Sequence, residues 1–118
     1  MYLLANNKNI FAYTGARPHQ EGLESVVFVH GTGMDHTVWL LPARYFSHHQ
    51  FNVLATDLPG HGCSEGPTAA SIENMSDEVV AAMDAAKIER AAIVGHSMGS
   101  LISLALAARY PCLLYTSD

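Results

Sequence analysis

A serine flanked by glycines stands where a short apolar run meets a long apolar segment. Residues 91–94 read Ala-Ala-Ile-Val, Gly95-His96-Ser97-Met98-Gly99 follows, and residues 98–109 have the composition of a buried helix. A Gly-x-Ser-x-Gly turn between a strand and a helix holds its serine in a strained backbone conformation and exposes the hydroxyl. Free N–H groups at the helix start favour negative charge beside it. This pattern predicts that Ser97 is a nucleophile.

The glycines of this turn have a steric explanation. Any side chain two positions before or after the serine would collide with the neighbouring strand or with the helix start, so Gly95 and Gly99 are required there. His96, beside the nucleophile, is expected either to line the site or to pack structurally.

Five further segments must position the turn. Two apolar runs, 25–30 and 51–56, predict buried parallel strands, and each ends in a glycine-rich loop. Strands alternating with helices indicate an α/β fold with a mostly parallel sheet flanked by helices. The other expected elements are an antiparallel strand near a sheet edge over 9–16 and a helix over 36–49, whose apolar face has Val38, Leu41 and Tyr45 with Trp39, Pro42 and Phe46 beside them. An amphipathic helix is expected over 71–87, capped by Ser71, with Ile72, Met75, Val79, Met83 and Ala86 on its apolar side.

Composition limits the function classes. The 118 residues suffice for one small domain; they are 49% hydrophobic and 14% charged, with a net charge of −5. Isolated basic residues argue against a nucleic-acid partner. No segment has the apolar length of a membrane span, no signal peptide is recognisable, and two cysteines form no disulfide framework. We expect a cytoplasmic protein; the oligomeric state is not encoded in these patterns.

Three motifs in order carry a family resemblance. His30-Gly31-Thr32-Gly33 follows the first buried strand, Asp57-Leu58-Pro59-Gly60-His61-Gly62-Cys63-Ser64 follows the second, and Gly95-His96-Ser97-Met98-Gly99 follows the third. Their order, spacing and strand context resemble the α/β-hydrolase family, whose fold the chain is then expected to share from about residue 9 to residue 111. A single pentapeptide would be weak evidence, whereas three ordered motifs are specific.

The resemblance implies residue roles. Ser97 is the nucleophile, and the backbone N–H groups of Met98 and Thr32 form the oxyanion hole. Neither a cofactor nor a metal is implied. The residues expected to shape the site are His30, Gly31, Gly33, Gly95, His96 and Gly99.

A serine at this turn, rather than the aspartate of the similar haloalkane dehalogenases and epoxide hydrolases, implies acyl transfer to water through an acyl-enzyme. The expected protein is a serine hydrolase acting on an ester-type bond of a small-molecule acyl substrate. The alternatives on the same fold are an acyltransferase, a lyase, a cofactor-free oxygenase and a non-catalytic binding protein.

In this family an acid and then a histidine follow the serine, on loops well downstream. No histidine follows Ser97, and Asp118 lies too close behind the helix to be the acid. Residues 1–111 are therefore expected to be the N-terminal part of a hydrolase domain, truncated after the helix that follows the serine, and inactive alone. Residues 112–118 are expected to be non-native, because Cys-Leu-Leu-Tyr-Thr-Ser is the in-frame translation of a common sequencing adapter.

Three other interpretations fit the sequence less well. Gly31-Thr32-Gly33 after a strand, with Asp57 further on, mimics a dinucleotide-binding fingerprint, but His36 occupies the third glycine position and the 95–99 turn is left unexplained. A zinc site at His30, His36 and His61 matches no ligand spacing. Asp57 precedes the serine and so stands in the wrong place for the triad acid.

Overall fold

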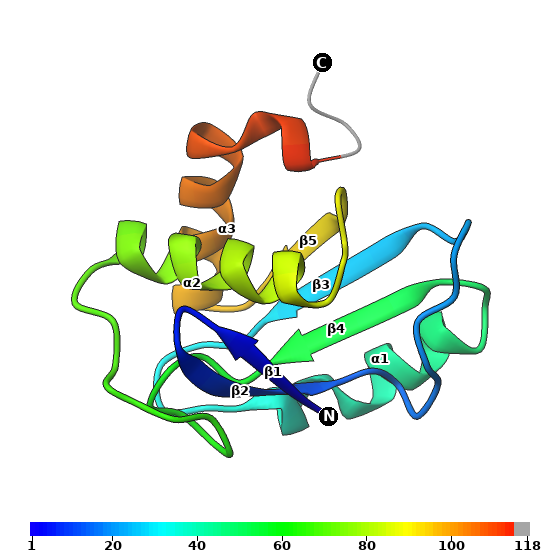
Figure 1. Ribbon diagram of the computed structural model, residues 1–118, viewed down its shortest axis with the longest axis horizontal. Helices are drawn as coiled ribbons and strands as arrows, with labels where there is room; N and C mark the ends of the chain where they lie inside the picture. Colours follow the sequence, from blue (N-terminus) through cyan, green and yellow to red (C-terminus); the bar gives the residue numbers. More distant parts are fainter. Residues whose placement is uncertain (115–118) are drawn as a thin grey trace.

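The computed structural model describes residues 1–114, which form a five-stranded mixed sheet with helices on both faces (Figure 1). The strand order is β1-β2-β4-β3-β5; β3 pairs parallel with both β4 and β5, whereas β2 pairs antiparallel with β1 and β4. The strands are β1 (Tyr2–Ala5), β2 (Lys8–Tyr13), β3 (Ser25–Val29), β4 (Asn52–Thr56) and β5 (Ala92–Gly95). The helices are η1 (His36–Trp39), α1 (Leu40–Ser47), α2 (Ile72–Ala85), α3 (Met98–Arg109) and η2 (Pro111–Leu113).

The antiparallel end of the sheet is a hairpin that the sequence analysis identified only in part. The strand expected over 9–16 runs from Lys8 to Tyr13 and is antiparallel and near the sheet edge, as predicted; β1 lies outside it, with Ala5 opposite Lys8. β1 was missed: its outward residues Tyr2 and Leu4 are exposed, so its four residues carry little apolar signal.

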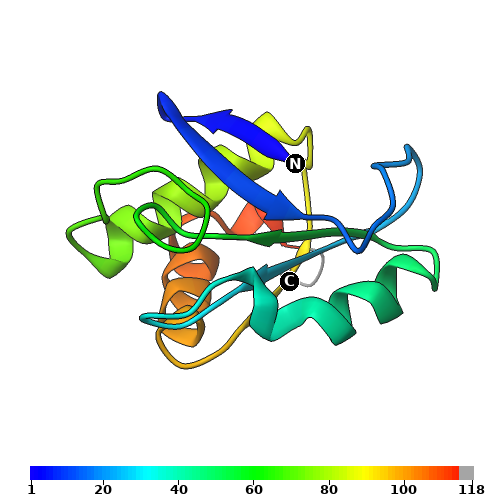
Figure 2. The same ribbon diagram turned by 90° about the horizontal axis from the view of Figure 1, so that it is seen from below.

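Two apolar layers, one on each face of the sheet, hold the fold together. On one face, Val27, Val29 and Leu54 pack against α2 and α3. On the other face, Val26 and Phe28 pack against α1. Figure 2 shows α1 and α2 on opposite sides of the sheet. Alternate residues of β3 therefore point to both cores, as expected for a strand that is buried along its whole length.

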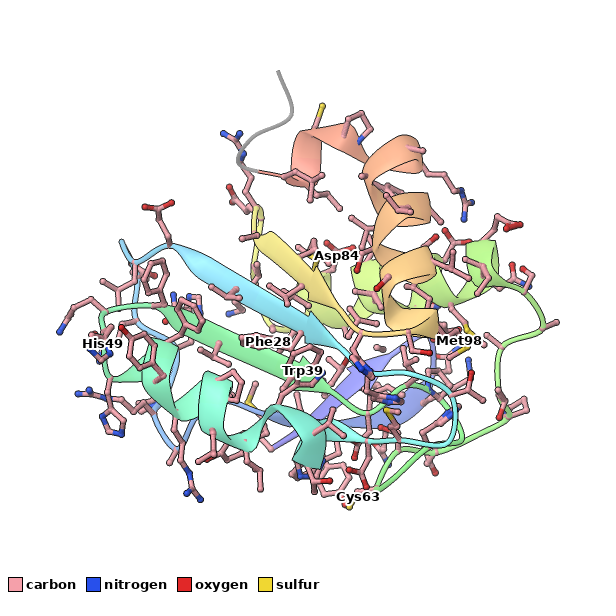
Figure 3. The ribbon with its side chains drawn as sticks, turned by 180° about the vertical axis from the view of Figure 1, so that it is seen from behind. Phe28, Trp39, His49, Cys63, Asp84 and Met98 are labelled. Atoms are coloured by element: carbon pink, nitrogen blue, oxygen red, sulfur yellow. The ribbon has the colours of Figure 1, made fainter. Side chains whose placement is uncertain are left out.

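The apolar face predicted for the helix over 36–49 is confirmed only in part. Val38, Leu41 and Tyr45 are exposed. Trp39 and Phe46, which were predicted beside them, pack on the sheet against Phe28 at ring-centroid distances of 4.9 and 6.0 Å, and Figure 3 shows Trp39 next to Phe28. The predicted helix is also divided into η1 and α1, and Asp35 caps η1 by accepting a hydrogen bond from the Thr37 N–H.

The predicted amphipathic helix is α2. Met75, Val79 and Met83 are buried as expected. Ser71 caps the helix, since its hydroxyl accepts a hydrogen bond from the Asn74 N–H at 3.0 Å. Such a cap contributes about 1 kcal/mol to helix stability.

α3 was expected to be buried all round, and among residues 1–114 it is not. Ile102 and Leu106 face the core, whereas Leu101 is 55% and Leu104 67% exposed. Within the described residues, the only strand paired with β5 is β3, on one side, and a groove of about 650 Å³ lies between β5 and α3. The described residues therefore leave part of the apolar surface of α3 uncovered.

Candidate active site

Ser97 lies at the sharp turn between β5 and α3 and has a backbone conformation that L residues rarely adopt. Its φ is 58° and its ψ −121°, directly before the first residue of α3. A non-glycine residue with this conformation costs on the order of 1–3 kcal/mol and is held in place only by its surroundings. The side chain is exposed. The structure thus gives the turn the strained backbone that the Gly-x-Ser-x-Gly pattern predicted.

Both flanking glycines lie where a side chain has no room. A methyl group on Gly95 would overlap the backbone of Gly99 and lie 2.6 Å from the Ser103 Oγ. A methyl group on Gly99 would overlap the Val29 carbonyl oxygen and lie 2.8 Å from that of His30. The predicted steric requirement for Gly95 and Gly99 is therefore met, and α3 begins in direct contact with the end of β3.

The loop after β3 lies against the serine turn. A methyl group on Gly31 would lie 3.1 Å from both the Ser97 Cβ and the His96 carbonyl oxygen. The Met34 N–H donates to the Gly31 carbonyl at 3.2 Å and closes a tight turn in which Gly33 has a φ of 72°. Among residues 1–114, no backbone carbonyl accepts a hydrogen bond from the Thr32 N–H.

The side chains of Thr32 and Met98 join the two segments. The Thr32 hydroxyl donates to the Met98 Sδ at 2.9 Å. Figure 3 shows Met98 at the start of α3, beside the loop that follows β3. Met98 is the first helical residue, so its N–H has no partner within the helix. The two residues predicted to supply oxyanion N–H groups are thus brought together next to Ser97.

His30 is buried beneath this loop and held by two hydrogen bonds. Its Nε2 accepts from the Leu58 N–H at 2.9 Å, so the proton is on Nδ1, which donates to the Gly31 carbonyl at 2.8 Å. Burial lowers the pKa of His30 below the usual 6.5, although the hydrogen bond to Gly31 opposes this effect. A neutral ring therefore ties the loop after β3 to the loop after β4, consistent with the predicted site-shaping role.

The lowered pKa of His30 predicts that acid destabilises the fold. As the pH falls below 6.5 the unfolded chain binds a proton at this histidine before the folded chain does, so this contribution to stability is present above pH 6.5 and is lost below it. The slope is at most about 1.4 kcal/mol per pH unit. Urea unfolding at a series of pH values should show it. His30→Gln should remove this part of the slope, while His19→Gln, at an exposed loop position, should keep it; equal slopes in both variants would contradict the assignment.

Asp57 forms a second tie between the two loops. Its buried carboxylate accepts hydrogen bonds from the His36 N–H at 2.6 Å and the His36 Nδ1 at 2.9 Å through Oδ1, and from the Cys63 N–H at 2.9 Å through Oδ2. The His36–Asp57 pair could not be predicted from the sequence, because its residues lie 21 positions apart. A carboxylate bound in this way is not free for a ribose, which removes the basis of the dinucleotide interpretation.

Metal ligation is not supported by the donors that lie together. In the described part of the chain, Asp35, His36 and Asp57 each bring one donor atom within 4.8 Å of the others. However, the Asp57 carboxylate is occupied by its N–H donors, and the Asp35 carboxylate accepts from the Thr37 N–H and hydroxyl. These contacts explain the cluster as loop structure.

His96 contributes through its backbone. Its N–H donates to the Val29 carbonyl at 3.2 Å, and its carbonyl accepts from the Gly99 N–H at 2.9 Å. Its side chain is exposed among the described residues, so the packing role that was one of its two expected roles is not seen there. Of the chain end expected to be non-native, residues 112–114 lie in η2 and a single bridge from Leu114 to Ala91, while residues 115–118, including Asp118, lie outside the described residues.

Comparison with known proteins shows the class to which this fold and site belong. The model of the alpha/beta hydrolase fold family matches residues 24–113, and the chain is a member of this family. The match spans β3, the serine turn and α3. The resemblance inferred from the three motifs is therefore confirmed.

Three relatives of the chain are named for different enzymatic activities. An (E)-2-((N-methylformamido)methylene)succinate hydrolase of Acinetobacter baylyi is 34% identical over 77% of the chain and 35% of its own length. The dihydrolipoyllysine-residue acetyltransferase component of the acetoin cleaving system of Cupriavidus necator is 40% identical over 76% of the chain and 24% of its own length. The crystal structure of the enol-lactonase from Burkholderia xenovorans LB400 superposes with a TM-score of 0.85, at 32% identity over 97% of the chain and 44% of that structure.

The chain thus spans less than half the length of each of these relatives. Among residues 1–114, no helix combines the length and the apolar character needed to cross a membrane.

Proposed function

We propose that these residues are the N-terminal part of a serine hydrolase that cleaves an ester-type bond of a small acyl substrate. Ser97 is the nucleophile, and the backbone N–H groups of Thr32 and Met98 bind the oxyanion. The acid and the histidine of the triad belong to polypeptide beyond residue 114. Hydrolase names among the relatives support the reaction class, and the short coverage of those relatives supports the assignment as a part.

The observation that carries this proposal is the backbone of Ser97. Ser97 is exposed and has a strained φ of 58°, and it lies between two glycines at which a side chain would overlap neighbouring backbone. Strain of this kind is retained where it presents a reactive group.

The proposed acylation begins when the Ser97 Oγ attacks the substrate carbonyl carbon. The hydroxyl proton passes to the histidine base, a C–O bond forms, and the carbonyl electron pair moves to the oxygen, which the two N–H groups stabilise. Collapse of this intermediate expels the alcohol, which takes the proton, and leaves an acyl-enzyme for water to hydrolyse. Removing one oxyanion donor typically costs about 10²–10³ in turnover.

Acyl transfer to a thiol or alcohol acceptor is the second candidate function. It uses the same acyl-enzyme, and the Cupriavidus relative is named as an acetyltransferase component. The two differ only in the acceptor of the second step, so product analysis with and without an added thiol separates them.

The first experiment is a long sequencing read of the source DNA across the Pro111 codon. We expect the reading frame to continue and to encode an acid and then a histidine after further strands. A native stop directly after residue 118, or a continuation without that histidine, would contradict the proposal. The 118 residues alone should show no saturable esterase turnover, because they lack the base that activates Ser97.

The second experiment labels the full-length parent with a fluorophosphonate, which reacts with activated serines. The modified peptide should contain Ser97, and Ser97→Ala should abolish labelling. Ser100→Ala, three residues along and exposed on α3, is the matched control and should keep it. Labelling that persists in Ser97→Ala would assign the nucleophile elsewhere.

A further inference from the structure

The Thr32 side chain lies at the proposed oxyanion site, where its hydroxyl makes only a weak hydrogen bond. It donates to the Met98 Sδ at 2.9 Å, and Thr32 itself is exposed. A thioether sulfur is a weak acceptor. A substrate oxygen that acquires negative charge is a far stronger one, because hydrogen bonds to ionised acceptors are roughly twice as strong as neutral ones. The hydroxyl therefore loses little when it turns to such an oxygen.

The backbone fixes where this hydroxyl can reach. Thr32 follows Gly31, at which a Cβ would lie only 3.1 Å from the Ser97 Cβ, and the Met34-to-Gly31 hydrogen bond closes the turn around Thr32. The hydroxyl and the N–H of Thr32 belong to one residue, so an oxygen bound by that N–H lies within reach of the side chain after a χ1 rotation. The hydroxyl contacts the side chain of Met98, the residue directly after Ser97.

We propose that the Thr32 side chain is a catalytic residue that donates a third hydrogen bond to the developing oxyanion, beside the two backbone N–H groups. This inference rests on the proposed function of Ser97. Because the substrate carbonyl oxygen is a weaker acceptor than the oxyanion, the extra bond is strongest in the transition state. It therefore increases kcat more than substrate affinity.

The test uses the full-length parent with p-nitrophenyl acetate as substrate. Thr32→Val keeps the branched shape and removes the hydroxyl, and it should lower kcat by about 100-fold while KM changes by less than about threefold. Thr32→Ser restores a hydroxyl and should recover most of the lost kcat. Thr14→Val, at a threonine directly after β2 and outside the site, is the matched control and should leave kcat unchanged.

Two further readouts separate a hydrogen bond to the oxyanion from a structural effect. Inhibition by a boronic acid, whose adduct with serine mimics the tetrahedral intermediate, should weaken in Thr32→Val by about the same factor as kcat. Met98→Leu removes the sulfur but leaves the Thr32 hydroxyl, and it should lower kcat by only a few-fold.

The outcomes separate the two proposals. If Met98→Leu reproduces the full loss seen in Thr32→Val, the hydroxyl acts through Met98 and the inference is wrong. Ser97-dependent turnover with an unchanged kcat in Thr32→Val overturns the inference alone. A parent without Ser97-dependent turnover overturns the proposed function and the inference together.

Discussion

Ser97→Gly is expected to raise the free energy of unfolding by about 1 kcal/mol while it abolishes fluorophosphonate labelling of the parent. The serine has a φ of 58°, which costs a non-glycine residue on the order of 1–3 kcal/mol, whereas glycine adopts it without steric penalty. The larger conformational entropy of glycine in the unfolded chain offsets about 0.5–1 kcal/mol of this gain. Removal of a serine nucleophile lowers kcat by about 10⁶-fold in a well-studied protease.

Two neighbouring variants isolate the cause. Ser97→Ala also removes the hydroxyl but keeps a Cβ in the strained conformation, so it should lose activity without the gain in stability. Ser100→Gly introduces the same residue three positions on, inside α3, where glycine lowers helix stability by about 0.5–1 kcal/mol. Urea unfolding of the three variants measures the differences. If Ser97→Gly were as destabilising as Ser100→Gly, the positive φ of Ser97 would carry no energetic cost, and the prediction would be contradicted.

Gly99→Ala is expected to lower the free energy of unfolding by about 3 kcal/mol. At an open helical position this change would be favourable by about 1 kcal/mol. Here the added methyl group would overlap the Val29 carbonyl oxygen and lie 2.8 Å from that of His30. Both obstacles are backbone atoms of a strand end that is buried between two layers, so neither can move aside cheaply. A loss of this size is a large part of the total stability of a small domain.

Ser100→Ala is the control, since it adds no atom and lies at the next, exposed position of the same helix; it removes only the hydrogen bond that the Ser100 hydroxyl donates to the Gly95 carbonyl at 3.2 Å. Its effect should stay within about 1 kcal/mol. Chemical unfolding of both variants gives the comparison, with circular dichroism to verify the fold. A loss below about 1 kcal/mol in Gly99→Ala would mean that α3 can shift away from β3, and that the serine turn is less tightly held than its contacts indicate.

The buried strands and the serine turn were predictable because one physical requirement dominates each of them. β3 and β4 are continuous apolar runs, as strands with both faces covered must be. The turn needs glycine wherever two backbone segments come too close for a side chain, and Gly95 and Gly99 occupy such positions. The order of the three motifs then placed Thr32 and Met98 beside Ser97.

Helix orientation was not predictable in the same way. The segment over 36–49 has apolar residues on two faces, and periodicity alone does not choose between them; the sheet selects the face of Trp39 and Phe46, because their rings fit against Phe28. The His36–Asp57 pair could not be found either, since a hydrogen bond between two loops leaves no periodic trace. The Thr32–Met98 contact depends on side-chain rotamers, which the motif does not specify.

β5 leads into the turn that holds the proposed nucleophile, Ser97, and is also the last strand of the described sheet. β3 holds it on one side through parallel pairing from Ala92 to Gly95, and the turn begins at its end. Thr32 follows β3, so the alignment of Ser97 with its proposed donors depends on the angle between these two neighbouring strands. A small rocking of β5 about its hydrogen bonds to β3 would tilt Ser97 relative to Thr32. Polypeptide that covers the open side of β5 would therefore restrict changes in the angle between β5 and β3.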